Sequence, residues 1–281
     1  MTWGLLGVVI VLGLLLERVG HRRRVRQAVQ SRLRALEQIH LLRLLLEQVQ
    51  RHRGLCFGFM SGEVSLEAQR WSVSQHVQQL LERAAEHQAN LFWYAPWHTV
   101  LPLWEQIEHD REKASAEAVL QLHHRLADRI LSTIESLGNR HDLICLGALA
   151  PQPQGMWMEL LRNTEMLGQA RAIGTGIAAR RQNSALQHQE LRRLREQIIA
   201  QVYVAPARLS TEPSLRALLD GQVREAEESL DAMVSAMDQL LASLEQPGMR
   251  SITYFSIATQ AICAQLDLVD LLIDHLRTSI K

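Results

Sequence analysis

The sequence predicts an all-α protein in which an N-terminal transmembrane helix is followed by one or two up-and-down helical bundles. In the second case, two stacked four-helix bundles share long helices. Three observations predict this class: apolar residues recur at helical spacing in almost every segment after residue 20, the first 16 residues carry no charge, and prolines gather between the periodic segments. With 281 residues, 47% hydrophobic and 21% charged, the chain can bury a substantial core.

The uncharged run from Met1 to Leu16 is the first element, and we expect it to lie in a bilayer. At about 1.5 Å per residue it spans only about 24 Å of a roughly 30 Å hydrocarbon core, unless Glu17 and Arg18 snorkel and the helix extends to Gly20. A cleaved signal peptide is the alternative. However, no basic residue precedes the apolar run and no Ala-x-Ala-like site follows it. We therefore expect a single-pass anchor over residues 1–20.

A basic juxtamembrane segment is expected over residues 21–36. Arginines crowd into 22–34, although the formal net charge of the chain is zero. Such a segment is attracted to anionic headgroups by about 1 kcal/mol per basic residue, and it places the rest of the chain in the cytoplasm, at a bacterial-type inner membrane. The zero net charge gives little support to a nucleic-acid partner.

The remaining chain, 37–281, is expected to form one helical domain. Its apolar periods predict helices over about 25–61, 64–90, 112–137 and 156–203, the last of which can break near Asn183, and then a hairpin of two helices over about 213–246 and 252–280. The prolines fall in the connections 91–104, 138–155 and 203–213. Antiparallel helices joined in this way make up-and-down bundles.

Three cysteines lie far apart in the sequence. Cys56, Cys145 and Cys263 each have apolar neighbours, which favours reduced, buried thiols over a disulfide framework or a zinc cluster. We therefore expect a reducing compartment.

An arginine interrupts the apolar stripe of the first long helix. The stripe runs from Leu46 through Val49 to Arg53 and then Cys56, so the guanidinium of Arg53 is expected to point into the bundle. A lone inward charge costs several kcal/mol unless it meets an anion or hydrogen-bond acceptors.

A second arginine occupies a core position on a later helix. Leu167, Arg171 and Gly174 fall on one face of it. Glycine inside a helix costs about 1 kcal/mol relative to alanine, so Gly168, Gly174 and Gly176 need a reason. Close approach of another helix or of a small ligand would supply one.

These two segments together carry a resemblance. Arg53-Gly54 on one helix and Gly168-Gln169-x-Arg171-Ala172-x-Gly174 on another resemble the two marks of the nitrate- and nitrite-sensing (NIT) domain. The resemblance implies two stacked four-helix bundles whose inward arginines hold a small planar anion. Arg53 and Arg171 would then bind the anion, and the candidate pocket lining is Val49, Cys56, Gly168 and Gly174.

The chain departs from the family pattern beside both arginines. Family members usually carry Glu there, whereas this chain has His52 and Ala170. Loss of these internal counter-ions either strengthens the attraction for an external anion or marks a site out of use. In the alternative structural interpretation, both arginines cap backbone carbonyls or pair with a core acid such as Glu165.

Other segments carry weaker signals. The aromatic residues of 91–104 either contact the bilayer interface or plug the end of the core. His123 and His124 are adjacent, face different directions and are expected at the helix surface. No catalytic motif or metal-ligand set is present in the sequence, so we expect no enzyme activity, metal or cofactor.

The leading functional hypothesis is a membrane-anchored cytoplasmic sensor that binds nitrate, nitrite or a similar small anion and signals by helix repacking. Because the chain ends with its bundle, we expect the signal to pass to a protein partner or across a homo-oligomer interface. The second hypothesis is a ligand-free NIT-like scaffold that recruits a partner protein to the inner membrane.

Overall fold

The computed structural model describes residues 2–86, 88–144, 155–180, 184–210, 213–242 and 248–280; the side chains of 1–16 and a few others beside the gaps lie outside this description. Every regular element in these ranges is helical, which confirms the all-α prediction. The α-helices are α1 (Thr2–Met60), α2 (Glu67–Glu86), α3 (Gln88–Leu91), α4 (Val100–Asp110), α5 (Ala116–Arg140), α6 (Met156–Ala179), α7 (Ala185–Gln197), α8 (Val204–Ser210), α9 (Pro213–Leu241) and α10 (Ser251–Ile280).

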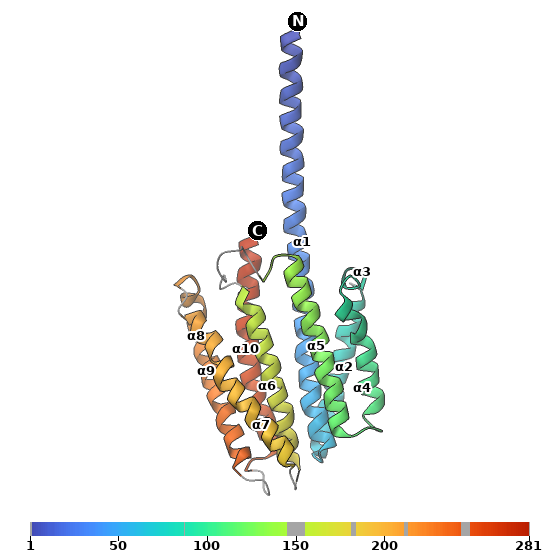
Figure 1. Ribbon diagram of the computed structural model, residues 1–281, viewed down its shortest axis with the longest axis vertical. Helices are drawn as coiled ribbons and strands as arrows, with labels where there is room; N and C mark the ends of the chain where they lie inside the picture. Colours follow the sequence, from blue (N-terminus) through green and yellow to red (C-terminus); the bar gives the residue numbers. More distant parts are fainter. Residues whose placement is uncertain are drawn as a thin grey trace.

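The helices form two groups that lie side by side (Figure 1). The first group contains α1, α2, α4 and α5, and the second contains α6 to α10. No described helix runs through both groups. Instead, α1 contacts helices of both, because α6 and α10 pack against it. The expected alternative of stacked bundles that share long helices is therefore wrong for the described residues: the two groups lie side by side and meet at an interface.

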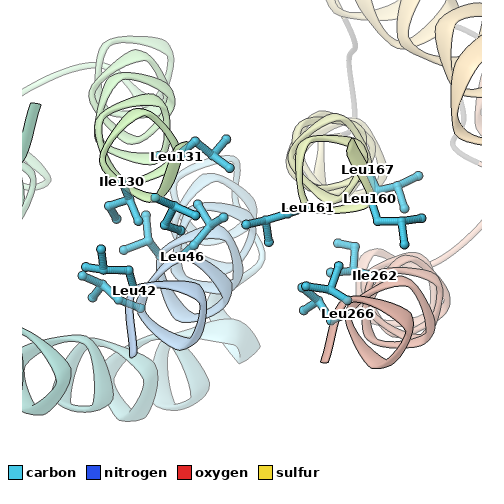
Figure 2. Packing of buried hydrophobic residues seen from close by; sticks show 14 of the residues in the cluster. Leu42, Leu46, Ile130, Leu131, Leu160, Leu161, Leu167, Ile262 and Leu266 are labelled. Carbon is cyan, nitrogen blue, oxygen red and sulfur yellow. The ribbon is translucent and has the colours of Figure 1, made fainter. Parts of the chain in front are cut away.

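A single continuous core crosses that interface. Figure 2 shows Leu161 of α6 pointing toward Leu46 of α1, while Leu160 and Leu167 point toward Ile262 and Leu266 of α10. All of these side chains are at most 2% exposed. Because α6 presents apolar side chains in two directions, it joins the groups, and separating them would expose both faces to water.

Several helix boundaries follow from local chemistry. α1 ends before Gly62, whose φ of +114° reverses the chain at little steric cost. Ser115 caps α5 by accepting a hydrogen bond from the backbone N–H of Ala118 at 3.2 Å, and Ser184 caps α7 in the same way with Leu186.

The structure places helices within two of the expected connections. The connection expected at 91–104 contains a 3₁₀ turn at Ala95–Thr99 and the start of α4, and the one expected at 203–213 contains α8. Pro102 does not prevent α4 because it lies in the first turn, where the missing N–H would have no partner within the helix. The helix expected over 156–203 is divided into α6 and α7 in the region of the expected break; Asn183 itself lies outside the described residues.

The cysteine prediction is partly wrong. Cys56 is a buried free thiol, but Cys263 is exposed, because it falls on the opposite side of α10 from the buried Ala261, Ile262 and Gln265. Cys145 lies outside the described residues.

The aromatic segment divides between core and surface. Tyr94 and Trp104 are buried in the core, whereas Phe92 and Trp93 are 60% and 75% exposed. The segment lies at the end of the first group from which α1 projects (Figure 1).

The N-terminal part of α1 projects alone from the bundle (Figure 1), and residues 17–34 are largely exposed before burial begins at Ala35. Among the described residues, the helix whose length and apolarity would allow a membrane crossing is α10, and 56% of its apolar window is buried within the protein. Such burial is typical of a core helix. The transmembrane span expected over 1–20 is not supported by the length and apolarity of the described residues, and it stays a prediction.

The close packing of α6 against α10 leads to a first prediction. A Cβ added at Gly174 would lie 2.3 Å from the ring of Tyr254, which is fully buried. Gly174→Ala should therefore lower the free energy of unfolding by about 1–3 kcal/mol through overpacking. Chemical denaturation measures this change.

The matched control is Gly221→Ala on α9, where nothing lies within 4 Å of an added Cβ. That variant should gain about 0.5–1 kcal/mol from higher helix propensity. A Gly174→Ala protein as stable as Gly221→Ala would contradict the close packing.

Candidate anion site between α1 and α6

Two buried arginines face each other across the α1–α6 interface. The two helices run parallel here, because Gly54 lies beside Arg171 and Gly58 beside Thr175. Arg53 and Arg171 are only 1% and 2% exposed, which confirms their predicted inward orientation.

Glycines lie beside both arginines, on the facing helices. A Cβ at Gly168 of α6 would lie 2.6 Å from Nη2 of Arg53, so this glycine makes room for the Arg53 guanidinium. At Gly54 of α1 an added Cβ would lie 2.9 Å from the ring of Phe255, and Nε of Arg171 is at an ordinary contact distance of 3.5 Å. The predicted close approach at Gly174 is also present, although the approaching group is the ring of Tyr254.

Arg53 has a carboxylate partner. Its Nη1 and Nη2 donate to Oε1 and Oε2 of Glu165 at 2.5 and 3.2 Å, a two-pronged pairing that fits the planar guanidinium. Gln50 and Gln169 also donate to this carboxylate, each at 3.0 Å. The structure therefore contains the ion pair between Arg53 and Glu165, which the sequence analysis gave as an alternative to anion binding.

Arg171 has no such partner. Its Nη1 donates to the hydroxyl of Thr259 on α10 at 3.0 Å, and its guanidinium carbon lies 5.0 Å from the ring centre of Phe255. Nε and Nη2 are buried without a hydrogen-bond partner among the described residues. Burial, and next the positive charge of Arg53, lower the pKa of Arg171 to about 9.

The site therefore holds two guanidinium groups and one carboxylate. A buried charge without a counter-ion costs several kcal/mol, and small anions relieve that cost by accepting charge-assisted hydrogen bonds. The site is closed to solvent, since Arg53 and Arg171 are only 1% and 2% exposed.

Of the residues predicted to line the anion pocket, some lie beside the two arginines and one does not. Val49 is buried one turn before Arg53, and Gly168 packs under the Arg53 guanidinium. Cys56 is also buried, but its sulfur contacts Met60 at 3.8 Å and it lines a separate cavity. Gln50, Gln169 and Thr259 also belong to the site, but the sequence did not predict them as site residues. Of the three, Thr259 could have been found from the sequence, because it is a polar residue within the apolar stripe of α10.

A buried histidine pair adjoins the arginine site. The prediction that His123 lies at the helix surface is wrong: it is 1% exposed and lies 2.9 Å from His52, between Nε2 and Nδ1 respectively. Because His123 Nδ1 faces the carbonyl of Val119 at 2.8 Å, it carries the proton, and its Nε2 accepts from His52. Trp104 lies edge-on at 5.0 Å and encloses the pair. Helical periodicity could not predict this contact, because it joins residues 71 positions apart in the chain.

Burial lowers the pKa of both histidines, that of His123 to about 3 and that of His52 well below its usual value. Neighbouring His124 is lowered to about 3 by burial, and next by Arg53. Within the described ranges, no group of three or more His, Cys, Asp or Glu side chains could hold a metal ion.

The fold and the buried arginines define the class of this protein as an all-α helical-bundle domain with a cation-rich interface between its two helix groups. The family model for nitrate and nitrite sensing matches residues 44–277, so the chain belongs to the NIT family. None of the curated proteins compared with the chain is significantly similar to it in sequence.

A solved structure described as the NasR transcription antiterminator is similar over 95% of this chain and 74% of that chain, with a TM-score of 0.65 and 20% sequence identity. At this identity the likeness concerns the fold and carries no activity to this chain.

The buried histidines give a prediction about pH. His123 binds a proton below about pH 6.5 when unfolded but only near pH 3 when folded, so its contribution to stability is present above pH 6.5 and is lost as the pH falls toward 3. Between pH 6.5 and 5 the free energy of unfolding should fall by about 2 kcal/mol from His123 alone. Urea denaturation at several pH values measures this.

In His123→Gln the dependence on pH should be shallower over this range, whereas the exposed His76→Gln should keep the original slope. Equal slopes in the wild type and His123→Gln would show that the pKa of His123 is the same in the folded and unfolded states.

Proposed function

We propose that this chain is a membrane-anchored, non-enzymatic sensor for nitrate, nitrite or a similar small anion, bound between Arg53 and Arg171. The observation that carries the proposal is Arg171, which is buried with two unpartnered nitrogen atoms and makes no ion pair with any described carboxylate. Membership of the NIT family supports the choice of ligand.

The arrangement suggests how an anion would be held. A planar anion with several oxygens can accept from Nε and Nη2 of Arg171 and from the nearby guanidinium of Arg53. To reach Arg53 it has to displace part of the Arg53–Glu165 pair. The displaced carboxylate keeps hydrogen-bond donors in Gln50 and Gln169, which lowers the cost of the exchange.

The same exchange provides a route for a signal. Arg53 lies on α1, Arg171 on α6 and its partner Thr259 on α10, so an anion at this point changes contacts among the three helices that join the two groups. The population shift is limited to the difference in anion affinity between the two packings. Because α1 continues into the N-terminal projection, a change in its packing would be transmitted along that helix. A protein partner or a second copy of the chain that binds the projection would then respond to the change.

The membrane anchor is a separate part of the proposal. It rests on the uncharged run at the N-terminus and on the arginine-rich stretch that follows, which favours a cytoplasmic bundle at a bacterial-type inner membrane. From residue 20 to the first buried residue, Ala35, the helix rises about 22 Å at 1.5 Å per residue. Phe92 and Trp93 would therefore reach the headgroups only if α1 were tilted.

The scaffold alternative is favoured by one observation. Glu165 already pairs with Arg53, so the closed site is internally compensated at one of its two arginines. A protein that has lost its ligand but still recruits a partner to the inner membrane would keep this packing.

Thermal unfolding with sodium nitrate distinguishes the two functions. In the sensor, the unfolding midpoint rises with nitrate, because ligand at 100 times its dissociation constant adds about 2.7 kcal/mol of stability. Arg171→Met should abolish that rise without lowering the midpoint of the ligand-free protein by more than a few degrees, since it also removes an unpaired buried charge. Sodium chloride at equal ionic strength is the salt control.

Arg224→Ala is the matched variant, because Arg224 is an exposed arginine of α9. It should respond to nitrate as the wild type does. A wild type that does not respond to nitrate or nitrite would favour the scaffold, and an equal response in Arg171→Met would end the assignment of the site.

Flotation in a density gradient tests the anchor. The full chain should float with membranes, and a chain without residues 1–20 should stay in the soluble fraction. A variant with Arg22, Arg23 and Arg24 replaced by Gln should still float, because the apolar run supplies most of the membrane affinity. A truncated chain that floats as well as the full chain would place the membrane attachment elsewhere.

A further inference from the structure

A second buried arginine without a carboxylate partner lies in the first turn of α2, beside the C-terminal end of α1. It is Arg70, which is 5% exposed. Its Nε and Nη1 are buried and have no hydrogen-bond partner among the described residues. Its guanidinium carbon lies 5.5 Å from the ring centre of Phe59 on α1.

Arg70 lines a cavity of about 160 Å³ between α1, α2 and the end of α4. We refer to this cavity as the Arg70 pocket; its lining residues are Cys56, Phe59, Met60, Glu67, Arg70, Arg111 and Glu112. At about 30 Å³ for each water-sized group, the volume accommodates a molecule of roughly four to six heavy atoms.

The acids near the pocket leave Arg70 unpaired. Glu112 is 79% exposed and pairs with Arg111 at 3.8 Å, and Arg111 also pairs with Glu108 at 3.4 Å. Glu67 is exposed and forms no ion pair with Arg70. Arg70 therefore makes no ion pair with a described carboxylate, although Glu67 and Glu112 also line the pocket.

The opposite wall is apolar. Phe59, Met60 and Cys56 come from the last two turns of α1, and the sulfur of Cys56 lies 3.8 Å from that of Met60. Burial raises the pKa of the Cys56 thiol to about 11, so this group is neutral and does not neutralise Arg70. A cation bound to the two sulfur atoms would be repelled by the adjacent guanidinium.

We propose that the Arg70 pocket binds a short aliphatic monocarboxylate, with its carboxylate on Arg70 and its alkyl part against Phe59, Met60 and Cys56. A carboxylate can accept a charge-assisted hydrogen bond from Nη1 of this buried guanidinium. A short alkyl chain matches the sulfur and aromatic wall better than a fully hydrated inorganic anion does. This site is distinct from the Arg53–Arg171 site and does not depend on it.

The test uses thermal unfolding of the full chain with sodium acetate, propionate or butyrate, against sodium chloride at equal pH and ionic strength. At ten times the dissociation constant of the carboxylate, the midpoint should rise by on the order of 3 °C. Arg70→Met should abolish this rise. Arg224→Ala, the exposed arginine control, should keep it.

A second variant distinguishes loss of ligand binding from misfolding of Arg70→Met. Met60 is half-buried at the edge of the pocket, so Met60→Trp fills the cavity while keeping Arg70. It should lose the carboxylate response and keep an unliganded midpoint close to that of the wild type. Isothermal titration with propionate supplies an independent reading.

Three results would overturn the proposal. The first is a wild type that unfolds at the same temperature with and without these carboxylates. The second is an equal response in wild type and Arg70→Met. The third is stabilisation by chloride or nitrate through Arg70 as strong as by carboxylates, which would make the pocket a general anion site.

Discussion

Parallel packing of α1 against α6 brings two buried guanidinium groups together with only one carboxylate to balance them. Gly168 leaves room for the guanidinium of Arg53, and Gly54 leaves room for the ring of Phe255 beside Arg171. Glu165 and two glutamines satisfy Arg53, while Arg171 depends on Thr259 and the ring of Phe255. The contact at which the two helix groups meet thus also holds an arginine without a carboxylate partner.

That coincidence bears on the proposed sensing. Because α6 presents apolar side chains in two directions and joins both groups into one core, a change at the arginines would be expected to affect both groups (Figure 2). An interior packed at high density responds by moving between discrete arrangements rather than by gradual deformation. The buried pair His52–His123 lies directly beside this point, because His52 precedes Arg53 on α1. Hydrogen-bonded neutral imidazoles there stiffen the α1–α5 contact without adding positive charge.

The two unpaired arginines differ in their surroundings. Arg171 lies in a closed interface, whereas Arg70 lines a cavity with a sulfur and aromatic wall. Under the two proposals the same functional group would bind two kinds of anion, with size and apolar contact rather than charge deciding which one fits. Both sites use side chains of α1, so the longest helix of the protein contributes to each of them.

Much of the fold could be predicted from the sequence, because helical periodicity, caps and prolines act over a few residues. The spacing from Val49 to Arg53 and from Leu167 to Arg171 placed both arginines inside, and the structure confirms this. The sequence also led to the NIT family, which the family model bears out. What only the tertiary structure decided are the contacts between distant segments: Glu165 as partner of Arg53, Thr259 beside Arg171, His123 against His52, and Cys56 in a different cavity. Periodicity fixes which face of a helix is buried, but the neighbour on that face depends on how helices separated by many residues pack.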